Sequence, residues 1–170
     1  GVILAGGRGT RLSPVTDCLN KHLLPIYNKP MIYYPISLLI LCGIKEILII
    51  TNKEDIPIFK RLLSKFKKLP VSFKFEIQKE ANGIAEAFNI SKNFIKKSEK
   101  NILILGDNFF YGQNLPMIIK NILLKSKNHI FLYRVKDSSN FGNVEIKNDK
   151  IISLEEKSKK IKNNLSITGL

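Results

Sequence analysis

The sequence predicts an α/β protein with a mostly parallel mixed sheet, flanked by helices and extended by an added antiparallel hairpin. Short apolar runs alternate with segments of helical periodicity, and this alternation is typical of β-α-β units. Two of the apolar runs, ending at Ala5 and Leu105, lead into glycine-containing loops. Further along, two alternating runs flank Asn148, Asp149 and Lys150, which are residue types that suit a tight hairpin turn.

Each expected element follows from its residue pattern. The run 2–5 is short, apolar and β-branched, as in a buried strand. Segment 30–42 has apolar residues at helical spacing and ends before Gly43, a natural C-terminal cap. Phenylalanines alternate with polar residues in 71–77, so we expect this strand to be half exposed or near a sheet edge. The remaining expected elements are strands at 44–51, 101–105, 130–135, 144–147 and 151–155 and helices at 52–64, 84–90 and 115–125.

Composition and charge narrow the functional classes. The 170 residues, 44% of them hydrophobic, are enough for one globular domain. The apolar runs are shorter than the ~18 residues of a membrane span and no secretory leader is visible, so we expect a cytoplasmic protein without a membrane partner. Cys18 and Cys42 indicate neither a disulfide framework nor zinc. The net charge of +14 comes mostly from dispersed lysines, which favours solvated faces over nucleic-acid binding.

The loop after the first strand has the residue types of a phosphate-binding site. Gly6, Gly7 and Gly9 allow bare backbone N–H groups to approach phosphate oxygens. Arg11 offers a planar fork for two oxygens of one phosphate, whereas Lys21 is a point charge that can follow a developing negative charge. Both cations fit a triphosphate better than a neutral ligand.

Two common phosphate loops do not match this stretch. A Walker A loop needs a Gly-Lys-Ser/Thr ending, but Gly9 is followed by Thr10 and Arg11. A dinucleotide fingerprint that begins at Gly7 needs glycine or alanine at position 12, which is Leu12.

The order GGxGTRL, SPVT, Lys21 and LLP resembles the sugar-1-phosphate nucleotidylyltransferases, and the match continues through PIYNKPMIYYPIS at 25–37. Within that family, the sequence of these motifs is most similar to that of the thymidylyltransferases that use glucose 1-phosphate. The resemblance implies a Rossmann-like nucleotidyltransferase core that transfers a nucleotidyl group from dTTP to glucose 1-phosphate, giving dTDP-glucose and pyrophosphate. Such products serve deoxysugar (dTDP-rhamnose type) and surface polysaccharide synthesis, and the resembled enzymes are homo-oligomers.

The resemblance also implies a domain layout. It covers nearly the whole chain and stops at ITGL, where the family continues. We therefore expect 1–170 to be a single nucleotidyltransferase domain truncated at its C-terminal end. In this layout 1–110 is the nucleotide-binding half and 111–170 begins the sugar-binding half.

The resemblance assigns three catalytic roles. Arg11 stabilises the departing pyrophosphate, and Lys21 offsets charge that grows at the α-phosphate. Asp107, in the family's LGDN motif, binds Mg²⁺, which prefers hard oxygen ligands such as one or two carboxylates plus substrate phosphates. Asp107 follows a strand expected to be central, where open α/β sheets bind ligands. The family's second metal carboxylate lies beyond residue 170.

Two further groups of residues are expected to bind the substrates. The amide of Gln78 presents a donor and an acceptor that match the edge of thymine or uracil, and in the resembled enzymes a glutamine and a glycine at the places of Gln78 and Gly83 contact the base. The expected nucleotide-binding set is Leu4, Gly6, Gly7, Gly9, Thr10, Arg11, Gln78 and Gly83. The expected sugar-phosphate set is Asn108, Gly142, Glu156 and Lys157.

Three positions depart from the family pattern, and several functions stay open. His22 replaces a glutamine, Phe141 a tyrosine and Ser158 a proline, so substrate preference could differ. His22 is not expected to act as a base, because the attacking phosphate oxygen is already anionic.

Alternatives to the thymidylyltransferase are an enzyme for UTP or another hexose 1-phosphate, a non-catalytic sugar-nucleotide binding module, and, on charge alone, a nucleic-acid binder.

Overall fold

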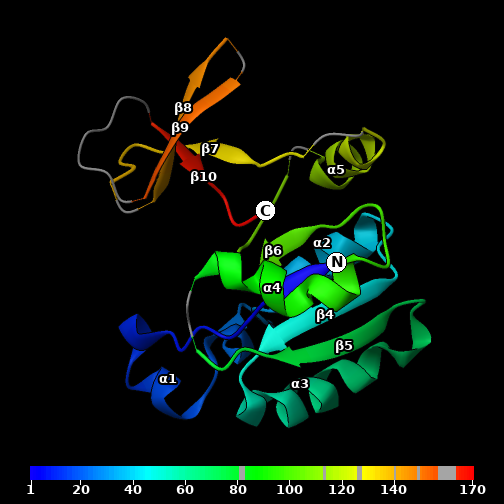
Figure 1. Ribbon diagram of the computed structural model, residues 1–170. Helices are drawn as coiled ribbons and strands as arrows, with labels where there is room; N and C mark the ends of the chain where they lie inside the picture. Colours follow the sequence, from blue (N-terminus) through cyan, green and yellow to red (C-terminus); the bar gives the residue numbers. More distant parts are fainter. Residues whose placement is uncertain (81–82, 113, 126–127, 140, 149, 157–163) are drawn as a thin grey trace. The chain divides into compact units, whose positions relative to one another are not determined.

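The computed structural model describes residues 1–80, 83–112, 114–125, 128–139, 141–148, 150–156 and 164–170. Two compact units divide the chain, Gly1–Ser126 and Lys127–Leu170 (Figure 1). The first contains a parallel sheet with its helices, and the second contains an antiparallel sheet. The predicted α/β class with an antiparallel hairpin is confirmed.

Four parallel strands form the sheet of the first unit. They are β1 (Val2–Leu4), β4 (Glu46–Thr51), β5 (Ser72–Ile77) and β6 (Leu103–Leu105), in the order β5-β4-β1-β6. The predicted edge position of 71–77 is confirmed, and its side chains alternate in exposure. The prediction that 101–105 is a central strand is wrong. The strands that follow β6 along the chain pair with one another in a second sheet, so β6 ends the order among the described residues.

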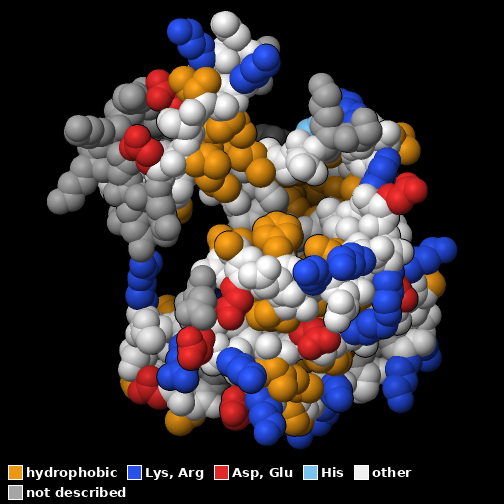
Figure 2. All heavy atoms as spheres, in the orientation of Figure 1, with side chains coloured by type: hydrophobic (Ala, Val, Ile, Leu, Met, Phe, Trp, Pro, Cys, Tyr) orange, Lys and Arg blue, Asp and Glu red, His pale blue; other side chains and the backbone are white. Residues whose placement is uncertain are grey.

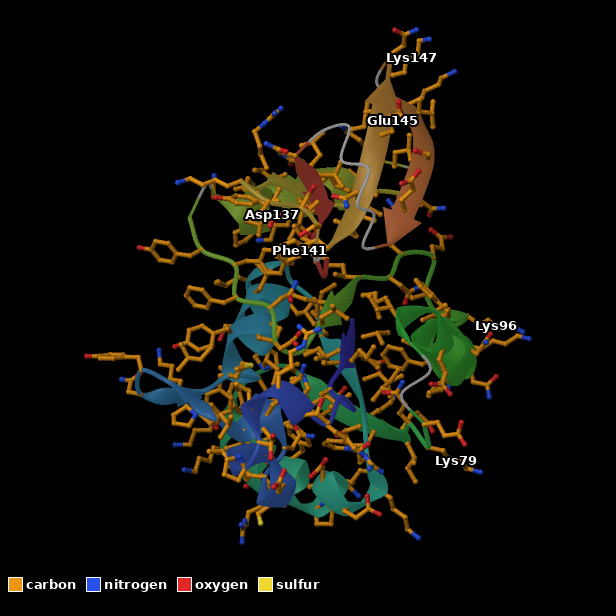
Figure 3. All side chains as sticks on the ribbon, turned by 90° about the vertical axis from the view of Figure 1, so that its left-hand side faces the viewer. Lys79, Lys96, Asp137, Phe141, Glu145 and Lys147 are labelled. Atoms are coloured by element: carbon orange, nitrogen blue, oxygen red, sulfur yellow. The ribbon has the colours of Figure 1, made fainter. Side chains whose placement is uncertain are left out.

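Helices cover both faces of this sheet. Figures 1 and 3 show α2 (Tyr33–Leu41) and α4 (Ile84–Ile95) on opposite sides of the strands. Ala87 of α4 is buried in a cluster with Val2, Leu48 and Ile50. The two inner strands, β1 and β4, are therefore buried on both faces, as their near-continuous apolar sequences require.

The ends of the helices differ in places from the sequence pattern. Helix α2 begins at Tyr33 because the residues before it form a small hairpin, β2 (Pro25–Ile26) with β3 (Lys29–Pro30). Gly43 caps α2 as predicted, with a φ of +85° and its N–H donated to Ile40 O. The expected helix 52–64 divides into the 3₁₀ turn η3 (Lys53–Asp55) and α3 (Ile56–Leu63). A proline in the first turn of α3 suits a helix start.

Short turns and two further helices complete the described part of the first unit. The 3₁₀ turns are η1 (Thr10–Leu12), η2 (Lys21–Leu23) and η4 (Ser64–Lys68), and the helices are α1 (Val15–Cys18) and α5 (Leu115–Leu123).

The second unit is an antiparallel sheet of β7 (Leu132–Arg134), β8 (Gly142–Lys147), β9 (Lys150–Glu156) and β10 (Leu165–Ile167). Its order is β7-β10-β8-β9. The predicted hairpin is β8 with β9, and Figure 3 shows Glu145 and Lys147 along it, with Lys147 at its tip. Among the described strands, the hairpin pairs with β10 in the second sheet and with no strand of the parallel sheet.

The distribution of surface charge and the length of the helices are relevant to possible nucleic-acid and membrane partners. On the face that Figure 2 shows, lysines and arginines of the first unit are interspersed with aspartates and glutamates. Among the helices of the described residues, none combines the length and the apolar character that crossing a membrane requires.

Candidate active site

The glycine loop begins where β1 ends. Ala5 donates its N–H to Ile50 O of β4, so the sheet fixes the start of the loop at its carboxyl edge. Gly9 has a φ of +65°, and a β-carbon there would lie 3.0 Å from Lys21 Cβ. A β-carbon on Gly7 would lie 3.5 Å from Lys21 Nζ. The loop therefore packs directly along the side chain of Lys21, which only a glycine at position 9 allows.

Lys21 and Asp107, two of the predicted catalytic residues, form an ion pair. Lys21 Nζ lies 2.5 Å from Asp107 Oδ2, and the two side chains are 21% and 35% exposed. Burial alone would raise the pKa of Asp107, but the hydrogen bond and charge of Lys21 outweigh it and hold that pKa below its ordinary value. The structure thus brings a cation and an ionised carboxylate together from η2 and from the loop after β6.

A buried asparagine holds the turn that carries Lys21. Asn20 Nδ2 donates to Ala5 O at 3.1 Å and to Asp55 Oδ2 at 2.7 Å. Asn20 Oδ1 accepts the N–H of His22 at 2.9 Å. Thr51 Oγ1 also donates to Ala5 O, at 3.1 Å. These bonds tie η2 to the carboxyl ends of β1 and β4.

His22 is the buried side of the same turn, with 1% of its surface exposed. Its Nδ1 lies 2.7 Å from Asn20 Oδ1, and because that oxygen only accepts, Nδ1 carries the proton. Burial first, and the charge of Lys21 second, lower the pKa of His22 from 6.5 to about 4, while Asp107 acts in the opposite direction. A β-carbon on Gly106 would lie 2.7 Å from His22 Cδ2, so glycine at 106 makes room for the ring.

Gln78 lies behind the glycine loop. It follows β5, donates its N–H to Thr51 O at 2.9 Å, and is 5% exposed. A β-carbon on Gly6 would lie 2.3 Å from Gln78 Oε1, so the amide touches the loop. Gln78 Nε2 donates to Glu86 Oε2 at 2.9 Å. Gly83, the other predicted base contact, has a φ of +88° and precedes α4.

The other predicted nucleotide residues lie on the same edge of the first unit. Leu4 ends β1, and its carbonyl oxygen accepts the N–H of Gly106 at 2.9 Å. Thr10 and Arg11 are exposed in η1, directly after Gly9. Asn108, which belongs to the predicted sugar-phosphate set, follows Asp107 and donates its N–H to Leu105 O at 3.2 Å.

The predicted sugar-phosphate residues of the second unit are only partly described. Gly142 pairs with Glu156 across β8 and β9, and a β-carbon on Gly142 would lie 3.3 Å from Ile167 Cδ1. Phe141 is exposed and donates its N–H to Ser138 O. The side chain of Glu156, together with Lys157 and Ser158, lies outside the described residues.

Two residues that contact the candidate site are absent from the sequence-based prediction. Glu86 bonds to Gln78, and Asn20 bonds to Ala5 and His22. Glu86 carries a partial signal, because an acidic residue in the first turn of a helix after a glycine is often placed for its charge. Asn20 gives a weaker signal, since asparagine before a turn is common in any loop.

The residues at this edge are compatible with a magnesium ion held mainly by its substrate. Asp107 is an ionised, partly exposed carboxylate. Within the described ranges there is no cluster of three or more His, Cys, Asp or Glu side chains that could hold a metal. Mg²⁺ in nucleotide enzymes often uses one or two carboxylates, with phosphates and water as the other ligands. One carboxylate beside the glycine loop fits that arrangement.

Comparison with known proteins decides the family. The model of a family described as Nucleotidyl transferase matches residues 1–170. The chain belongs to this family. Glucose-1-phosphate thymidylyltransferases of Neisseria gonorrhoeae and Mycolicibacterium smegmatis are 45% and 44% identical to this chain over 100% of its length. The chain spans 59% of the length of each of these relatives.

Solved structures agree with the family. A crystal structure from Bacillus anthracis, described as a glucose-1-phosphate thymidylyltransferase in complex with a sucrose, superimposes with a TM-score of 0.88 at 39% identity. The match covers 99% of this chain and 68% of that one. A UDP-glucose pyrophosphorylase complexed with UDP-glucose has a TM-score of 0.78 at 20% identity, which shows the shared fold alone.

Proposed function

We propose that this nucleotidyl transferase is part of a glucose-1-phosphate thymidylyltransferase, which joins dTTP and glucose 1-phosphate into dTDP-glucose and releases pyrophosphate. The observation that carries the proposal is the Lys21–Asp107 pair beside the glycine loop. In the proposed site the lysine would bind a phosphate of the triphosphate and the carboxylate would bind a metal ion. The thymidylyltransferases that match the whole length of the chain support the same reaction. dTDP-glucose would then serve deoxysugar and surface polysaccharide synthesis.

In the proposed reaction, a phosphate oxygen of glucose 1-phosphate attacks the α-phosphorus of dTTP in line and expels pyrophosphate. The N–H groups of Gly7 and Gly9 and the guanidinium of Arg11 hold the triphosphate and stabilise the leaving group. Lys21 leaves Asp107 and pairs with the α-phosphate, where negative charge grows. A magnesium ion, when bound by Asp107, would supply further charge neutralisation at the phosphates. Positioning and electrostatics thus supply the catalysis.

The sugar phosphate would be bound by the remaining predicted residues. Asn108 and the backbone of Gly142 would orient it, Glu156 would accept bonds from sugar hydroxyls, and Lys157 would neutralise its phosphate. The assembly into a homo-oligomer and the location in the cytoplasm stay predictions.

Nucleotide preference tests the proposal. Magnesium-dependent pyrophosphate release is measured on the full-length protein with glucose 1-phosphate and, in turn, dTTP, UTP, CTP, ATP and GTP. Arg11→Ala and Asp107→Ala are measured in parallel, with Arg61→Ala as the control for loss of an exposed arginine. We expect dTTP to be preferred and each site variant to lose about 100-fold or more in rate, the usual scale for one electrostatic contact to the transition state.

Other outcomes would lead to different functions. A preference for UTP would leave the chemistry in place and change the nucleotide, because thymine and uracil share the edge that Gln78 would contact. Binding of dTTP without pyrophosphate release, in folded protein, would favour a non-catalytic binding module and contradict the proposal.

A further inference from the structure

A charged residue holds the amide that is proposed to read the base. Gln78 Nε2 donates to Glu86 Oε2 at 2.9 Å, and Glu86 lies in the first turn of α4. Gln78 itself is 5% exposed. A buried amide has few alternative partners, so this charge-assisted hydrogen bond largely determines the orientation of the Gln78 amide.

The chemistry of Glu86 fixes which end of the amide faces the glycine loop. An ionised carboxylate has acceptors only, so the amide nitrogen of Gln78 must face it. Turning the amide by 180° would place Oε1 against a carboxylate oxygen and lose the bond. Oε1 therefore stays on the side of Gly6, where a β-carbon would lie 2.3 Å from it.

A fixed amide discriminates between pyrimidines. Thymine and uracil carry a hydrogen on N3, which an amide oxygen accepts, and a 4-oxo group, which the second hydrogen of Nε2 can reach. Cytosine has an acceptor at N3 and a 4-amino donor, so it would need the amide in the opposite orientation. A freely turning glutamine could satisfy either base.

We propose that Glu86 is a positioning residue that sets base preference by locking the Gln78 amide with its oxygen toward the glycine loop. The inference rests on the proposed function, since it assigns the reading of the base to Gln78. It adds a residue outside the base-contacting set, one that acts only through Gln78.

The test is the ratio of dissociation constants for dCTP and dTTP, measured by titration calorimetry on the full-length protein and on Glu86→Gln. Glutamine at 86 has the same shape but can accept or donate, so the Gln78 amide becomes free to turn. We expect the ratio to fall about tenfold. This is the change in a dissociation constant that one hydrogen bond produces when it forms with one base and not with the other. Both constants come from the same preparation, so a loss of folded protein leaves the ratio unchanged.

A control and a spectroscopic measurement separate positioning from a general charge effect. Glu76→Gln removes a carboxylate from an exposed site on β5 and should leave the ratio unchanged. The side-chain amide resonances of Gln78 should shift in Glu86→Gln without nucleotide. If the wild type prefers dTTP and Glu86→Gln keeps that preference in full, the role of Glu86 is wrong while the proposed function stands. If the wild type does not distinguish the two nucleotides, both proposals fail.

Discussion

In the absence of substrate, the charges of Lys21 and Asp107 neutralise each other in an ion pair. The two groups lie 2.5 Å apart and neither is fully exposed, so each would be costly to leave alone. In the proposed reaction both exchange partners, the lysine for a phosphate and the carboxylate for a metal ion. The exchange keeps each charge neutralised, which limits the cost of opening the pair.

Replacing Lys21 with methionine should raise the pKa of Asp107. The hydrogen bond and the charge that hold this pKa down are then lost, whereas the burial that raises it remains. A carbon-detected NMR titration of the carboxyl group measures the change. Lys74→Met, which removes an exposed partner of Glu46, is the control and should leave Asp107 unaffected. An unchanged pKa in Lys21→Met would mean that the pair is not formed in solution.

His22 should make the stability of the protein fall on acidification. Its pKa is lowered from 6.5 to about 4 in the folded chain, so below pH 6.5 the unfolded chain binds a proton that the folded chain does not. Stability present above pH 6.5 is therefore lost progressively toward pH 4. Between pH 7 and pH 5 this loss should be about 2 kcal/mol in the free energy of unfolding.

Urea unfolding at the two pH values, for the wild type and for His22→Gln, measures the contribution of His22. Glutamine cannot titrate, so the variant should lose less stability between pH 7 and pH 5 by roughly the same 2 kcal/mol. Equal losses in both proteins would show that His22 is protonated in the folded chain as readily as in the unfolded one.

At the scale of the element, α4 links the core to the candidate site. Its buried residue Ala87 packs against β1 and β4, and Glu86 beside it bonds to Gln78. A helix that is fixed by its packing on the sheet can hold a side chain at its first turn in one position. The placement of Gln78 thus depends on how closely α4 approaches the strands.

Ala87→Leu should destabilise the protein by about 1–3 kcal/mol, because the added side chain overfills a close-packed interface. Ala85→Leu makes the same change at an exposed position of the same helix and should cost little. Urea unfolding of both variants makes the comparison. Equal stability of the two would contradict the close packing of α4 on the sheet.

Strands and helices were predictable from sequence where periodicity or composition was strong. The buried run of β4 and the alternation in β5 have such patterns. β7 and β10 have three residues each, and β10 pairs with both β7 and β8, which are distant from it in the chain. Local sequence pattern does not predict which distant strands pair. The strand at 130–135 and the hairpin were therefore predicted, whereas β10 and its pairings were not.

At the scale of the whole molecule, the candidate residues fall in both units. The predicted nucleotide-binding and catalytic residues lie in Gly1–Ser126, and three of the predicted sugar-phosphate residues, Gly142, Glu156 and Lys157, lie in Lys127–Leu170. Residue types, spacing and the family's motifs were enough to propose the glycine loop, Lys21 and Asp107 as site residues. They were not enough to find Asn20 or Glu86, because their bonds to Ala5 and Gln78 exist only once the sheet brings the loops together.

The most direct test of the proposed reaction is to identify its product. The full-length protein is incubated with dTTP, glucose 1-phosphate and Mg²⁺. The nucleotides are then separated by chromatography and identified from their masses by mass spectrometry. We predict that dTDP-glucose and pyrophosphate form in equal amounts. In Asp107→Asn the rate of their formation should fall by about 100-fold or more. Folded protein that binds dTTP but forms no dTDP-glucose, or an Asp107→Asn variant that forms it at the wild-type rate, would contradict the proposed reaction or the role of Asp107 in it.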